Sequence, residues 1–168
     1  MTTYIAVDSL NKPRINDFIR EHWFTTDMAI RGKLVDLTRA EGFVACEDGR
    51  IVGLVTYFVT GGVCEITSLD SLAGRRGIGT ALVGKVVEAA KGRGCFKIVL
   101  ITTNDNLNAM RFYQKRGFDM THLYRNALDA ARMLKPEIPL VGSEGIPLKH
   151  EIEFELDLKS PTHTRDKE

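Results

Sequence analysis

The sequence lacks an excess of charge of either sign. Its 23 lysine and arginine residues are balanced by 22 aspartate and glutamate residues, which leaves a formal net charge of +1. A protein that binds DNA, RNA or an anionic membrane needs a broad positive surface. We therefore expect no nucleic-acid partner and no membrane partner, whereas a small anionic ligand needs only a local cluster of positive charge.

Long apolar runs and paired cysteines are also missing. No stretch approaches the roughly 18 apolar residues of a membrane-spanning helix, and residues 1–10 lack the pattern of a signal peptide. The four histidines show no metal-ligand spacing. Buried free thiols in a reducing compartment are favoured, because no C-x-x-C pair occurs among Cys46, Cys64 and Cys95. We expect a cytoplasmic protein that binds no metal.

A length of 168 residues suits one domain. We expect residues 1–159 to form it and the polar residues 160–168 to be a disordered tail. Hydrophobic periodicity predicts a helix from Pro13 and further helices over 78–90, 106–116 and 127–134. Strands are predicted over 1–7, 43–46, 51–60, 63–72, 98–101, 118–124 and 151–158.

Two of these strands indicate the class of the fold. Residues 98–101 are all apolar, as in a strand that is covered on both faces. Residues 151–158 alternate strictly, which predicts acidic side chains toward solvent and apolar side chains toward the core. The order predicts an α/β domain with a mostly antiparallel sheet and one strand–helix–strand unit. Residues 23–41 match no single pattern and are left unassigned.

A glycine-rich turn joins a predicted strand to a predicted helix and reads Gly74-Arg75-Arg76-Gly77-Ile78-Gly79-Thr80. Glycine lets the backbone approach a ligand closely, and the free N–H groups at a helix N-terminus attract anions. With two arginines beside them, these groups predict a phosphate or pyrophosphate site. The alternative is a plain turn that caps the helix, with its arginines in solvent.

Two other phosphate motifs are excluded. A dinucleotide fingerprint would need glycine where Leu82 stands. Residues 79–86 come close to a P-loop, but Val86 replaces the hydroxyl residue that binds magnesium.

A second motif lies further along the chain. Asn106, Ala109 and Tyr113 match the pattern N-x-x-A-x-x-x-Y, and the pair Gly117-Phe118 follows them. Together with the glycine turn, compared with R/Q-x-x-G-x-G/A, this order resembles the GNAT superfamily of N-acetyltransferases over roughly residues 43–158. The chain departs from that pattern at Gly74, where the family has arginine or glutamine, and the two arginines that follow are candidates to supply the charge.

The resemblance implies a fold and a donor. The fold is a GNAT-like mixed sheet, mostly antiparallel, whose central parallel strands splay apart and are flanked by helices. Acetyl-CoA, the implied co-substrate, lies in that gap. Backbone groups at Thr67 and Leu69 then bind the pantetheine and polarise the acetyl carbonyl, and Asn106 contacts the pantetheine arm. The pyrophosphate is held by Gly74, Arg75, Arg76, Gly77, Ile78, Gly79 and Thr80.

The implied reaction moves an acetyl group to a primary amine by direct attack, without a covalent enzyme intermediate. Tyr113 is the candidate acid for the departing thiolate, because a phenol is protonated at neutral pH and can still donate a proton. Glu65 is the candidate base, with Asp70 a weaker one. Their alternatives are a core aromatic residue for Tyr113 and a solvent-facing strand carboxylate for Glu65.

The resemblance places the acceptor between residues 23–37 and the loop 121–149. Candidates to line that site are His122, Tyr124, Arg125 and Arg132. The acidic row of Glu151, Glu153, Glu155 and Asp157 is a further candidate, to attract a cationic amine, and its alternative is a solvated strand face. We expect a small-molecule amine; a protein or peptide N-acetyltransferase and a catalytically silent acyl-CoA-binding module are the alternatives. Since many members of the family dimerise, a homodimer is also expected.

Overall fold

The computed structural model describes residues 1–23, 25–72, 74 and 77–159. The expectations for Arg75, Arg76 and residues 160–168 lie outside the described residues. The described part is built on a seven-stranded sheet in the order β1-β4-β5-β6-β7-β9-β8. In chain order the strands of this sheet are β1 (Thr3–Ala6), β4 (Glu41–Glu47), β5 (Arg50–Thr60), β6 (Val63–Ser71), β7 (Lys97–Thr103), β8 (Asp119–Tyr124) and β9 (Glu151–Asp157).

The pairing of these strands confirms the predicted α/β class and the mixed sheet. Only β6 and β7 pair in parallel, and every other neighbouring pair is antiparallel. The connection between β6 and β7 is the predicted strand–helix–strand unit. As the apolar run predicted, Ile98, Val99 and Leu100 are buried at the centre of the sheet.

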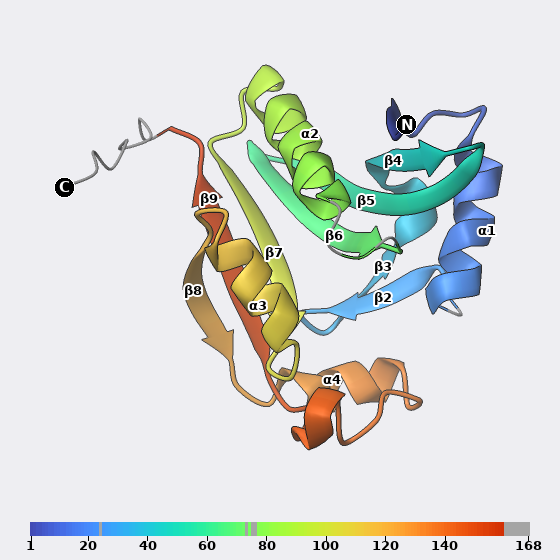
Figure 1. The fold of residues 1–168 in the computed structure, drawn as a ribbon. Coiled ribbons are helices and arrows are strands. Elements are labelled where there is room, and N and C mark those ends of the chain that lie inside the picture. The colour runs from blue at the N-terminus through green and yellow to red at the C-terminus, as the bar shows by residue number, and fades with distance from the viewer. Residues whose placement is uncertain (24, 73, 75–76, 160–168) are drawn as a thin grey trace.

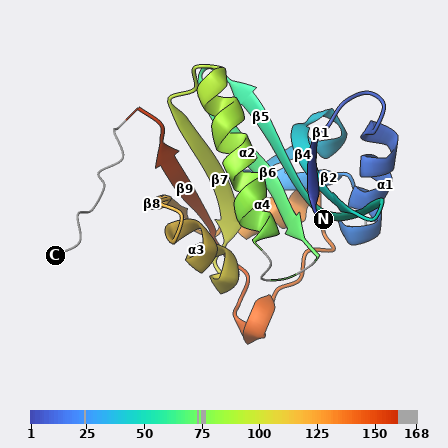
Figure 2. The ribbon, with the colours of Figure 1, turned by 45° about the horizontal axis from the view of Figure 1, so that its top comes forward.

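The helices are α1 (Lys12–Trp23), α2 (Ile78–Gly92), α3 (Leu107–Gln114) and α4 (Ala127–Leu134). They match the predicted helices, with ends that differ by up to two residues, and α4 has the predicted bounds. Helices α2 and α3 cover one face of the sheet (Figures 1 and 2). The unassigned segment holds a hairpin of β2 (Asp27–Ile30) and β3 (Lys33–Asp36), followed by a 3₁₀ turn at Leu37–Arg39.

Two cores form on opposite faces of the sheet because neighbouring strand residues point to opposite sides. Ala45 and Val55 face α2, in a core that also holds Leu82 and Val86 of that helix. Their neighbours Val44 and Leu54 belong to the second core, with Ile15, Phe18 and Ile19 of α1. A smaller cluster joins α4 to the loop that precedes β9, through Leu128, Ala131 and Leu148.

The acidic face of β9 corrects the sequence-based expectation. Glu151 is only 2% exposed, and Glu153 and Glu155 are partly buried rather than solvated. The β2–β3 hairpin accounts for this, because Arg31 at its turn donates to Glu151 through its backbone N–H and to Glu153 through its guanidinium. Buried carboxylates are tolerated where such donors compensate their lost hydration.

The structure also bears on the cysteines and on membrane-spanning helices. The cysteines are free, and Cys64 and Cys95 are buried, whereas Cys46 is partly exposed. The helices of this part of the chain are too short or too polar to cross a bilayer.

Close packing of α2 on β5 makes Gly53 sensitive to substitution. A Cβ at Gly53 would stand 2.8 Å from Cγ2 of Ile78 and 3.0 Å from the backbone oxygen of Asp70. We expect Gly53→Ala to lower the free energy of unfolding by about 1–3 kcal/mol, because either α2 or β6 must shift. Gly84→Ala is the matched control: Gly84 lies on the exposed side of α2 with open space around it, and alanine there should add about 0.5–1 kcal/mol. Urea denaturation of both variants measures the difference; equal stabilities would contradict the close approach.

Candidate active site

The two parallel strands separate halfway along their length. Pairing runs from Val63 opposite Lys97 to Ile66 opposite Leu100. Beyond this point β6 continues along β5 to Ser71, and β7 continues along β9 to Thr103. The backbone of β6 after Ile66 therefore turns an edge of N–H and C=O groups toward a gap instead of toward β7.

A β-bulge in β6 causes the separation. Tyr57 of β5 pairs with Ile66, and the next residue back, Thr56, pairs with Ser68, so Thr67 is one residue in excess. Such an extra residue bends its strand and increases the local twist. The Thr56 hydroxyl holds the bulge in place, since its oxygen lies 2.8 Å from that of Thr67 and 2.6 Å from that of Ser68, all three side chains being buried.

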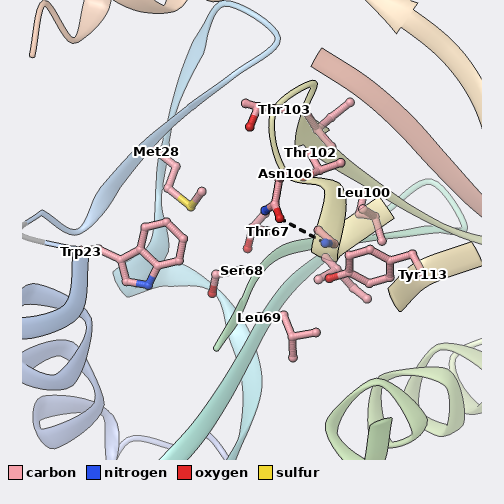
Figure 3. A pocket seen from close by; sticks show the side chains of 13 residues that line it. Trp23, Met28, Thr67, Ser68, Leu69, Leu100, Thr102, Thr103, Asn106 and Tyr113 are labelled. Atoms are coloured by element: carbon pink, nitrogen blue, oxygen red, sulfur yellow. Dashed lines mark hydrogen bonds between the residues drawn. The ribbon is translucent and has the colours of Figure 1, made fainter. Parts of the chain in front are cut away.

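The gap opens into a cavity of about 240 Å³. Four of the residues that line it were predicted from the sequence to contact the acyl group and the pantetheine arm of the donor: Thr67, Leu69, Asn106 and Tyr113. Figure 3 shows Tyr113 across this cavity from Trp23 and Met28, with its hydroxyl directed toward the interior. Asn106 is also the N-cap of α3, because its Oδ1 accepts the N–H of Ala109 at 3.1 Å.

Tyr113 is 6% exposed and is held by other aromatic rings. Its ring packs edge-on against Phe112 and Phe118, and Phe154 of β9 lies at 6.2 Å. Burial raises the pKa of the phenol well above its ordinary value, and the negative charge of Asp70 raises it further. The hydroxyl is therefore protonated at neutral pH and is fixed in direction by the packing of its ring.

The N-terminus of α2 lies against α3. Gly77 caps α2 with φ +76°, a left-handed conformation that glycine adopts without strain. A Cβ at Gly79 would stand 3.3 Å from the ring of Phe112, the neighbour of Tyr113. Ile78 anchors the first turn in the core, with 2% of its surface exposed. The N-terminus of α2, with its free N–H groups, is thus packed against α3, the helix that carries Tyr113. Gly74 is exposed and has open space around it.

Arg116 is a functional candidate that the sequence reasoning missed. Its guanidinium stacks on Phe112, 3.4 Å from the ring centroid, and donates to the Thr80 hydroxyl in the first turn of α2. Burial lowers its pKa from 12.5, yet arginine stays charged at neutral pH. The signal for Arg116 was its spacing from Phe112, since residues four apart share one face near a helix end.

Glu65, the sequence-based candidate base, is held away from this cavity. Its Oε1 accepts a hydrogen bond from the Arg31 guanidinium at 2.7 Å, and the same guanidinium binds Glu153 at 3.1 Å. Glu65 is not one of the described residues that line the cavity. Asp70, the weaker candidate, accepts the indole N–H of Trp23 at 2.8 Å, and burial raises its pKa.

A second cavity of about 240 Å³ adjoins the first. It lies between the β2–β3 hairpin, β7 and the segment from α4 to the start of β9. The hairpin and the α4 segment belong to the two regions expected to form an acceptor site. Of the four side chains named for that role, Arg132 donates to the backbone oxygens of Ile138, Pro139 and Leu148. His122, Tyr124 and Arg125 line a separate, open hollow beside Arg31. No cluster of three metal-ligating side chains occurs in the described parts of the chain.

Comparison with known proteins agrees with this geometry. The model of the Acetyltransferase (GNAT) family matches residues 8–118. The uncharacterized protein YdhI of Bacillus subtilis is 46% identical over 155 residues, which are 92% of this chain and 97% of that protein.

Solved structures share the fold at low sequence identity. An IAA acetyltransferase from Bacillus cereus superposes with a TM-score of 0.71 at 21% identity, over 94% of this chain and all of that one. A Bacillus subtilis acetyltransferase in complex with CoA gives a TM-score of 0.69 at 19% identity, over 94% of this chain and 99% of that one.

Arg31 is expected to stabilise the hairpin over the sheet. Arg31→Ala leaves Glu65 and Glu153 close together without their shared cation, so we expect a loss of roughly 1–3 kcal/mol in unfolding free energy at pH 7. Arg20→Ala is the control, because its ion pair with Asp17 is exposed and should contribute less than about 0.5 kcal/mol. Thermal denaturation of both variants at pH 7 tests this, and an equal loss in the two variants would contradict it.

Proposed function

The chain belongs to the GNAT family of acetyltransferases, and on this premise we propose that it transfers the acetyl group of acetyl-CoA to a primary amine of a small molecule. The observation that carries the proposal is the gap between β6 and β7 with the Tyr113 hydroxyl directed into it. A neighbour of the same fold binds CoA.

The donor would bind as an additional strand. The pantetheine arm carries two amides, which suit the free backbone edge of β6 at residues 67–69 in the way that a peptide adds to an exposed sheet edge. Its pyrophosphate would accept hydrogen bonds from the N–H groups of Gly77, Ile78, Gly79 and Thr80 at the start of α2. Arg116 adds a positive charge beside Thr80, and Asn106 lines the path between the two ends.

The chemistry would follow from the same arrangement. A backbone N–H of the bulged segment would polarise the thioester carbonyl and stabilise the oxyanion formed when the amine attacks. Tyr113 would then donate its proton to the departing thiolate, a role that suits a buried phenol kept protonated by its surroundings. The second cavity is bounded on one side by α4 and the loop before β9, which limits the room for an acceptor and favours a small amine over a peptide.

The acid role is tested by Tyr113→Phe. We expect turnover with saturating acetyl-CoA and amine to fall by about 10²–10⁴-fold, because the thiolate must leave without a proton. Affinity for acetyl-CoA should be unchanged, since the ring and its packing remain. Tyr57→Phe is the matched control: Tyr57 is a buried tyrosine of the same core that lines neither cavity. Thiol release measures turnover and calorimetric titration measures binding; full turnover in Tyr113→Phe would overturn the assignment.

The anion site is tested by two glycines at opposite ends of α2. Gly77 has φ +76° and Gly94 φ +71°, and a Cβ at either meets open space. Alanine at either position should therefore lower the free energy of unfolding by a similar amount, roughly 1–2 kcal/mol. Only Gly77→Ala should also weaken binding of acetyl-CoA and free CoA, by about tenfold, since strain there distorts the N–H groups that face the pyrophosphate. Equal CoA affinity in the two variants would contradict the proposed site.

A further inference from the structure

The second cavity shares a wall with the acyl gap. Trp23, Met28, Ile101, Thr102 and Thr103 line both cavities. Figure 3 shows Trp23 and Met28 on the side of the first cavity opposite Tyr113. A nucleophile that enters from the second cavity would therefore reach the thioester from the side opposite Tyr113.

The lining of the second cavity is largely apolar. Its walls beyond the shared residues include Ala29, Ile30, Leu128, Ile138 and Leu148. The charged residues that line it are Asp27, Lys135 and Glu151. The Lys135 ammonium donates to the backbone oxygen of Asp27 at 2.8 Å, which ties it to the hairpin.

Glu151 is the most deeply buried of the three, with 2% of its surface exposed. It stands at the start of β9, directly opposite Thr103 of β7. Its Oε2 accepts the backbone N–H of Arg31 at 3.1 Å. Its Oε1 accepts no hydrogen bond from the described residues, so one oxygen of a buried carboxylate is left for a ligand in the cavity that it lines.

The surroundings make this carboxylate a stronger base than an exposed one. Burial raises the pKa of Glu151 and the negative charge of Glu65 also raises it, while the backbone N–H and the charge of Arg31 lower it. Asp27 and Lys135 line the same cavity, Glu153 lies on the same face of β9, and the titratable Tyr124 stands opposite Glu151 on β8.

We propose that Glu151 accepts the ammonium proton of the acceptor, and that the acceptor is a small primary amine with an apolar body that occupies the second cavity. This inference rests on the proposed function. A cation suits the free carboxylate oxygen, and the apolar walls suit a hydrocarbon group. Glu65 and Asp70 are less suited because neither of them lines either cavity. Glu65 is also bound by the guanidinium of Arg31.

The ammonium gives one proton to Glu151, which later releases it to water. The nitrogen lone pair forms the new C–N bond, the C–S bond breaks with its electron pair on sulfur, and Tyr113 protonates the sulfur. A second proton, lost from the nitrogen through water, restores the phenol. One ammonium ion and one acetyl-CoA give one amide, one CoA thiol and one released proton.

The test uses the full chain, saturating acetyl-CoA and three probe amines: n-hexylamine, 2-phenylethylamine and 6-aminohexanoate. The wild type should acetylate the first two at least about tenfold more efficiently than 6-aminohexanoate, whose carboxylate would have to leave water for a largely apolar cavity. Efficiency is measured as kcat/KM for the amine by thiol release. Equal efficiencies, or no transfer to either apolar amine by a protein that binds acetyl-CoA, would overturn the inference and leave the proposed function standing.

The role of Glu151 is tested by Glu151→Gln, which keeps an oxygen to accept the Arg31 N–H. At pH 7 we expect kcat/KM to fall by about 10²–10³-fold, because only about one in a thousand molecules of an amine with a pKa near 10 is unprotonated. The deficit should narrow to less than about tenfold at pH 10, where free amine is abundant. A purely structural role would lower activity by one factor at every pH and would lower the melting temperature.

Two further variants sharpen the result. Glu153→Gln is the matched control, since Glu153 lies on the same strand and face and is also bound by Arg31, and it should keep the pH profile of the wild type. The second variant is Glu65→Gln. If kcat/KM falls at pH 7 and recovers at pH 10 in Glu65→Gln but not in Glu151→Gln, then Glu65 is the base and the inference is wrong. Titration with acetyl-CoA in every variant separates this outcome from a failure of the proposed function, in which the donor itself would not bind.

Discussion

The short parallel pairing of β6 with β7 is the constraint on which the rest of the site depends. Thr67 is one residue too many for the antiparallel ladder with β5, so β6 bends and the pairing with β7 ends at Ile66. A sheet normally satisfies its own backbone groups, and here the bend leaves a set of them facing a gap. Three buried hydroxyls hold the bulge, so the gap is a built feature of the sheet.

A single arginine organises the opposite side of the site. Arg31, at the turn of the β2–β3 hairpin, reaches carboxylates on two strands of the sheet, Glu65 and Glu153, and its backbone N–H meets Glu151. These contacts hold the hairpin over the acidic face of β9 and close the wall of the second cavity. The same closure buries Glu151, and burial is what raises the pKa of its carboxyl group.

Local patterns predicted those parts of the site that lie within one segment. The sequence predicted the start of α2 at Ile78 and the helix that Asn106 caps and Tyr113 lies on. Both were predictable because glycine conformation, helix capping and helical period act over a few residues. Helix α4 was also predicted with its observed bounds. The β2–β3 hairpin was not, since its strands are four residues each and its stability comes from Arg31 contacts with distant strands.

By itself, then, the sequence determined the order of helices and strands, the glycine-rich start of α2 and the place of Tyr113 on its helix, because each depends on near neighbours in the chain. Only the tertiary structure decided which carboxylate stands in a cavity. Glu65 and Glu151 have similar surroundings in the sequence, each on a strand beside apolar residues. Their difference arises from a hairpin more than a hundred residues away from Glu151 along the chain, which neutralises the first with a guanidinium and buries the second against an apolar wall.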